Sequence, residues 1–133
     1  MFRNGRPRIM ASELRVNTLK DASGNNSVAT STVAQGSAKA WAQQDGAAAT
    51  ARDSFNVASI TDEGTGDASY TLTNAMSDSN FSVTALTGYK ANSSVEIAHL
   101  RELTASKVRI RNTNSSSYRD PETYCSTVQG DLA

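Results

Sequence analysis

Short segments in which apolar and polar residues alternate recur along this chain, and they limit the folds that it can adopt. Such an alternation sets one side of a β-strand against a core, and clusters of Gly, Asn, Ser or Asp separate successive segments. The segments are residues 39–44, 52–60, 68–76, 81–87, 95–100, 107–112 and a last one that ends at 128. Short strands at this spacing indicate an all-β sandwich or small barrel, and we favour an antiparallel, jelly-roll-like β-sandwich. A helical turn competes only at residues 97–106.

Large apolar residues are few, so the core of this sandwich must be thin. Leu, Ile, Val and Phe together make 22 of the 133 residues, whereas Ser, Thr, Asn, Gly and Ala make 69. So small an apolar surface is a weak counterweight to an ordering cost of about 1 to 2 kcal/mol per residue, and we expect other chains to supply part of the burial. The expected core residues are Trp41, Phe55, Val57, Ile60, Tyr70, Leu72, Met76, Phe81 and Val83.

Charge is unevenly distributed, although 13 basic and 13 acidic side chains balance overall. Residues 1–20 hold five basic side chains against one acidic, and residues 41–100 hold two basic against seven acidic. We expect residues 1–38 to form an extended N-terminal arm, with a short strand at 14–19 and a loop at 27–38, and residues 39–133 to form the β-sandwich. In the arm, Arg3, Arg6 and Arg8 would dock on an acidic surface of a partner protein. The alternatives are a frayed terminus or a natural start at Met10.

Reactive residues are too scattered to indicate an enzyme. The only histidine, His99, is flanked by apolar residues, and the only cysteine, Cys125, excludes an intrachain disulfide and a multi-cysteine zinc site. A Cys125–His99 dyad is possible on paper, but no further residue pattern supports it. The acidic loop at 62–67 lacks the ligand spacing of an EF-hand and indicates a hairpin turn. We expect no catalysis, no cofactor and no metal site.

Two kinds of partner are also not expected. Apolar runs fall far short of the ~18 to 20 residues that cross a bilayer, so we expect no membrane insertion. Beyond the N-terminal arm there is no basic face with interleaved aromatic residues, so we expect no nucleic-acid binding.

The middle of the chain resembles a module that is common in virion proteins of tailed bacteriophages, including tail fibres. In that module a Lys-Ala-Trp strand precedes an Arg-x-Ser-x-Asn-Val hairpin that runs into Ser-Ile-Thr-Asp and Gly-Thr-Gly-Asp. The matching residues here are Lys39–Trp41, Ala51–Asp67, Tyr70–Leu72, Ala75–Phe81 and Gly130–Ala133. The resemblance covers about residues 12–133. It departs after Trp41 and at Val128–Gly130, where aromatic bulk is missing.

The resemblance implies a structural or adhesive β-sandwich, commonly in homotrimers, and a location in the virion. The first interpretation is a short tail fibre or spike subunit that is anchored to the particle through Arg3, Arg6 and Arg8 and contacts host-surface glycan. The second is a head decoration (cement) protein on the capsid. The third is a small bacterial carbohydrate-binding module, for which grouped exposed aromatic residues would be needed. All three are binding proteins rather than enzymes.

Overall fold

The computed structural model describes residues 14–48, 50–88, 95–114 and 116–133. Contacts divide the chain into two compact units, one ending at Val33 and one beginning at Ala34. This division falls within the helix Thr30–Gly36. The predicted boundary, after residue 38, lies just past the end of that helix.

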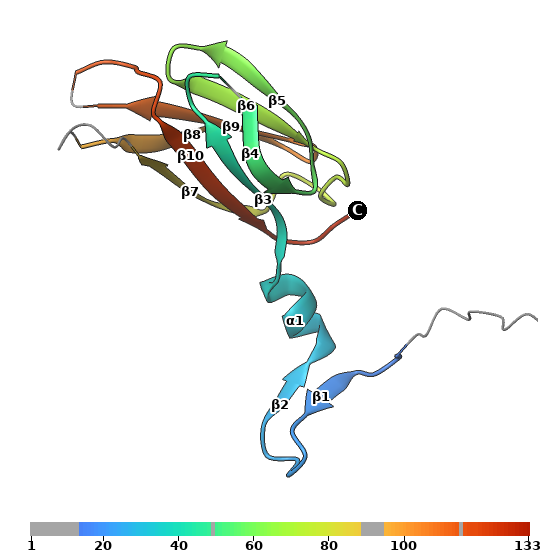
Figure 1. The fold of residues 1–133 in the computed structure, drawn as a ribbon. Helices are drawn as coiled ribbons and strands as arrows, with labels where there is room; N and C mark the ends of the chain where they lie inside the picture. Colours follow the sequence, from blue (N-terminus) through green and yellow to red (C-terminus); the bar gives the residue numbers. More distant parts are fainter. Residues whose placement is uncertain (1–13, 49, 89–94, 115) are drawn as a thin grey trace, which may run out of the picture. The chain divides into compact units, whose positions relative to one another are not determined.

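The second unit is an antiparallel β-sandwich, which confirms the predicted fold class (Figure 1). Sheet 1 has the strand order β4-β3-β10-β7, and sheet 2 has the order β5-β6-β9-β8. Sheet 1 consists of β3 (Ala38–Asp45), β4 (Thr50–Phe55), β7 (Ser82–Gly88) and β10 (Thr123–Gln129). Sheet 2 consists of β5 (Val57–Gly64), β6 (Asp67–Leu72), β8 (Ile97–Thr104) and β9 (Lys107–Thr113).

The chain enters and leaves the sandwich on neighbouring central strands. β3 and β10 pair antiparallel, and Ala38 at the start of β3 lies opposite Gln129 at the end of β10. The hairpin predicted at the acidic loop 62–67 is formed by β5 and β6, with Ile60 opposite Tyr70. Residues 97–106, for which the sequence also allowed a helical turn, contain strand β8.

Side chains from both sheets fill the interior between them. The buried cluster consists of Ala40, Ala68, Tyr70, Leu72, Met76, Val108, Ile110, Tyr124 and Val128. Tyr70 spans the two layers, because its hydroxyl accepts a hydrogen bond from Ser126 Oγ of sheet 1 at 3.1 Å. Burial raises the pKa of the Tyr70 phenol. Of the residues expected in the core, Tyr70, Leu72 and Met76 are buried, and the partly buried residues that pack against them are Val57, Ile60, Phe81 and Val83.

The assignment of Trp41 and Phe55 to the core is wrong. Trp41 is 36% exposed and Phe55 is 54% exposed. In β3 the positions that face the interior are Ala40, Ala42 and Gln44, so strand alternation turns Trp41 outward. Phe55 lies opposite Trp41 in the register of β3 and β4, and it therefore projects from the same outer face.

The first unit contains a short hairpin, β1 (Thr18–Lys20) and β2 (Ser27–Ala29), and it runs into helix α1 (Thr30–Gly36). The predicted loop at 27–38 is therefore wrong. The hairpin turn is closed by Asp21, whose carboxylate accepts hydrogen bonds from Asn25 N at 3.0 Å and Asn26 Nδ2 at 2.7 Å. Thr30 joins the two elements, because its amide donates to Asn17 O at 3.0 Å as α1 begins.

Candidate binding face of the sandwich

The two outer faces of the sandwich differ in chemistry, and this difference locates the candidate site. On sheet 2, the Asp67 carboxylate accepts hydrogen bonds from Arg109 Nε and Arg111 Nε, each at 2.8 Å. Burial acts to raise the pKa of Asp67, but the two guanidinium groups outweigh it and hold the pKa below its usual range. Lys107 Nζ pairs with Glu63 Oε1 at 3.0 Å on the same face. Sheet 2 thus neutralises these charges within the chain.

Sheet 2 also holds the histidine. His99 Nε2 lies 2.8 Å from Thr113 Oγ1, and both residues belong to strands of sheet 2. Cys125 lies on β10 of sheet 1. The structure therefore places the two members of the possible Cys125–His99 dyad on different sheets.

Two cross-strand rows of side chains form the middle of the outer face of sheet 1. One row runs Phe55, Trp41, Thr127, Thr84 from β4 to β7. The other runs Asp53, Gln43, Cys125, Leu86 in the same strand order. Asp53 is the only ionised side chain in the two rows. We call these eight residues the sheet 1 face.

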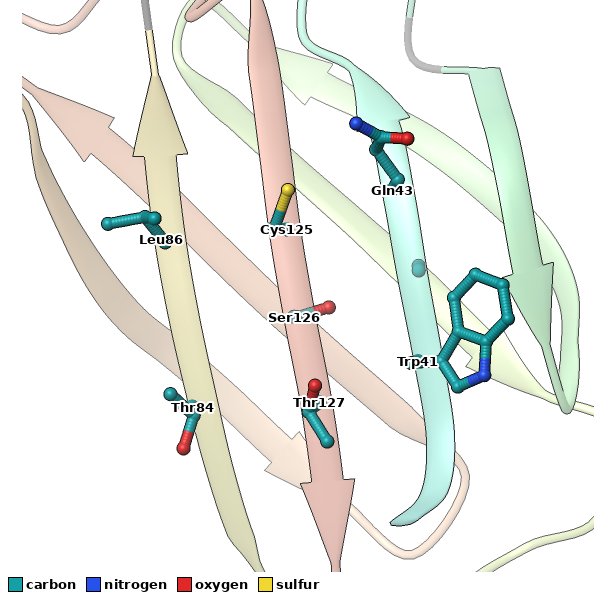
Figure 2. Close-up of a pocket in the computed structure, with 8 residues that line it drawn as sticks. Trp41, Gln43, Thr84, Leu86, Cys125, Ser126 and Thr127 are labelled. Atoms are coloured by element: carbon teal, nitrogen blue, oxygen red, sulfur yellow. The ribbon is translucent and has the colours of Figure 1, made fainter.

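A shallow groove of about 340 Å³ follows β10 across the sheet 1 face. Figure 2 shows Trp41 and Gln43 on one side of β10, Thr84 and Leu86 on the other, and Cys125 with Thr127 between them. The hollow lies over β10, where Cys125 and Thr127 have short side chains, and the longer side chains of Trp41, Gln43 and Leu86 stand on the flanking strands. Leu86 is 71% exposed, so the rim of the groove carries a large apolar side chain that nothing in the described chain covers.

The chemistry of this groove is that of a binding surface. Its polar groups are the Gln43 amide, the Thr84 and Thr127 hydroxyls and the Trp41 indole N–H, which are neutral donors or acceptors. Among the described residues no group of three or more His, Cys, Asp or Glu side chains is arranged to hold a metal ion. The groove offers apolar contact and uncharged hydrogen bonding.

The sequence did not predict the sheet 1 face, although one signal for it was present. Alanines flank Trp41 at positions 40 and 42, so the alternation in β3 is compatible with either side of the strand facing the core, and only the size of Trp41 favours its own side. The expected anchoring residues Arg3, Arg6 and Arg8 lie outside the described residues, and their role stays a prediction.

Comparisons of the chain with protein-family models, with curated proteins and with solved structures gave no match. In the described part of the chain, no helix has the length and apolar character to cross a bilayer.

Proposed function

We propose that this chain is a bacteriophage virion structural protein, a short tail fibre or spike subunit that works as a homotrimer and has no catalytic activity. The resemblance of about residues 12–133 to the virion module supports the class. The lone histidine and the lone cysteine lie on different sheets, which is consistent with a protein that acts by binding.

The observation that carries the proposal is that the described part of the first unit, residues 14–33, buries none of its large apolar side chains. Across residues 14–33, these side chains are between 37% and 78% exposed: Leu14, Val16, Leu19, Val28 and Val33. A two-stranded hairpin is marginal in water, and a helix of seven residues is too short to be stable by itself. We infer that other copies of this unit cover these side chains in the assembled protein.

The charge distribution supports attachment through the N-terminal arm. Five basic side chains lie in residues 1–20, and three of them are Arg3, Arg6 and Arg8. Arginine binds carboxylates through two parallel hydrogen bonds, so an acidic surface on a neighbouring virion protein is the partner that these residues suit. The sandwich then remains available to contact the host surface.

Two alternatives are kept. A head decoration protein would use the same arm and the same sandwich, and the number of copies per particle separates it from a fibre, which is present in far fewer copies. A small bacterial carbohydrate-binding module is favoured by one observation, the pairing of exposed Trp41 with exposed Phe55 on the sheet 1 face. That module would be absent from purified particles.

The oligomer is tested by changing one cross-strand pair in the first unit. Leu19 and Val28 lie opposite each other in the hairpin, and the next pair is Lys20 and Ser27. We expect Leu19→Asn with Val28→Asn to convert a trimer to a monomer in sedimentation velocity at micromolar concentration. The matched control, Lys20→Gln with Ser27→Asn, is expected to remain trimeric. A trimer that survives the first change, or a wild-type monomer, contradicts the proposal.

Attachment is tested separately with particles. Removal of residues 1–10 is expected to leave a trimer that no longer associates with the virion. Quantitative mass spectrometry of purified particles measures the copy number of the chain and of the truncated form. Full occupancy by the truncated form would show that the arm is not the anchor.

A further inference from the structure

We propose that the groove on the sheet 1 face binds a neutral saccharide. This inference deepens the proposed contact with the host surface, and it depends on the proposed function only for the source of the saccharide. It does not depend on the first unit, because every residue that it uses lies in the sandwich.

The shape of the groove suits a narrow, extended ligand. Its two walls stand on β3 and β7, which are separated by β10, so the walls are two strand spacings or about 9 to 10 Å apart. The floor is made of Cys125 and Thr127, whose short side chains leave the hollow along β10 (Figure 2). A volume of about 340 Å³ lies at the lower end of the range for small-molecule sites, about 300 to 1,000 Å³.

The lining matches a ligand that has both apolar and polar surfaces. A sugar ring presents C–H groups on its faces and hydroxyl groups around its edge. The Trp41 indole extends from β3 on the side away from β10 and Leu86 extends from β7, so the two flank the groove with exposed apolar surface on opposite sides of it (Figure 2). Gln43, Thr84 and Thr127 offer neutral hydrogen-bonding groups between them. Few polar groups in a largely apolar lining are typical of sites that orient small ligands.

The charge around the groove selects against anionic ligands. None of the side chains that form its walls and floor is a cation, and Asp53 lies beside Gln43 in the same row. Arg52, which lies one row further along this face, is engaged by Asp45 at 2.8 Å and by Thr123 Oγ1 at 2.9 Å. A phosphate or a sulfated chain in the groove would therefore meet no cation in its lining and would be repelled by the Asp53 carboxylate. A neutral saccharide avoids this repulsion, and carboxylate oxygens accept hydrogen bonds from hydroxyl groups.

A second copy of the sandwich fits this face less well. If two sheet 1 faces met with the two-fold axis through the groove, each hollow would lie against an equivalent hollow, and the short floor residues would stay uncovered. Stable interfaces are packed as closely as protein interiors. A second copy is nevertheless an occupant that the experiment must detect.

The sequence provides two probes of the groove. Trp41 is the only tryptophan and Cys125 is the only cysteine, so indole fluorescence and thiol reactivity both report on this face. We would titrate the purified full chain with cellohexaose, maltohexaose and chitohexaose. We expect at least one of them to shift the Trp41 emission to shorter wavelength in a saturable way, and to slow the reaction of Cys125 with a disulfide reagent.

Variants on the two sheets locate the binding. Gln43→Ala and Leu86→Ala are expected to weaken the apparent affinity about tenfold or more. Leu100→Ala is the matched control, because Leu100 is 48% exposed and lies on β8 of sheet 2. The control should bind as the wild type does. All these residues are exposed, so the variants should retain the fold, which circular dichroism checks.

Three outcomes would overturn the inference. The first is that none of the three saccharides causes a saturable change. The second is that Leu86→Ala binds saccharide with the same affinity as the wild type. The third is that the chain self-associates, that Leu86→Ala abolishes this self-association, and that saccharides have no effect. The last outcome would identify a second copy as the occupant. Because binding is measured on the purified chain, the inference can fail while the chain is still found in particles, and the proposed function then stands.

Discussion

Two truncations of apolar side chains in the sandwich should have clearly different effects on stability. Leu72 is 6% exposed and belongs to the buried cluster, and Leu→Ala changes at such positions cost about 2 to 5 kcal/mol. Phe55 is 54% exposed, so less than half of the ~1.5 to 3 kcal/mol available from full burial is at stake. We therefore expect Phe55→Ala to cost about 1 kcal/mol and Leu72→Ala at least twice as much.

Thermal unfolding followed by circular dichroism measures the difference. For a domain of this size, 1 kcal/mol shifts the melting temperature by roughly 4 to 8 °C, so Leu72→Ala should melt about 10 °C or more below the wild type. The measurement is repeated at several protein concentrations, because a partner that covers Phe55 would raise the cost of Phe55→Ala as concentration increases. Equal shifts for the two variants at low micromolar concentration would refute the assignment of Leu72 to the core and Phe55 to the outer face.

Further variants test single features of the sandwich. Asp67→Asn leaves two arginines without their shared anion and should cost about 3 kcal/mol at neutral pH. Because the pKa of Asp67 is lowered, its contribution is complete above about pH 4 and is lost as the pH falls through the folded pKa, so the variant should show a flatter acid-unfolding profile there. Gly46→Ala should lower the free energy of unfolding by at least about 1 to 3 kcal/mol in urea titrations, because an added Cβ would lie 1.8 Å from Pro121 O. Gly88→Ala is the control, because a Cβ there meets nothing within 4 Å. Asn56→Ala should cost about 1 to 3 kcal/mol by the same titration, because it removes the hydrogen bond that Asn74 N donates to Asn56 Oδ1 at 2.7 Å and places alanine at a φ of 57°.

The strands that the sequence predicted best are those whose large apolar residues all lie on one side. Tyr70 and Leu72 alternate with polar neighbours in β6, and both are buried as expected. Phe81, which directly precedes β7, and Val83 within β7 pack against the same cluster. In such segments the period of two and the size of the side chains point to the same face, so pattern alone identifies the interior.

The sequence failed where these two signals disagree. In β3 the interior positions are alanine and glutamine, and Trp41 lies outside. Hydrophobicity is only a one-way guide to burial, because folded proteins keep much of their apolar surface exposed. The candidate site was missed for the same reason, since Trp41 and Phe55 were assigned to the core. Helix α1 was missed because its seven residues have no charged residue at either end and no apolar stripe.

The pairing of Ala38 with Gln129 has a practical consequence for engineering. A fold whose two chain ends lie at the same place can be grafted into a surface loop of an unrelated carrier with short connectors, and its layers need not be pulled apart. The sandwich could therefore be displayed as an insert, with the groove facing solvent, on a scaffold chosen for its valency.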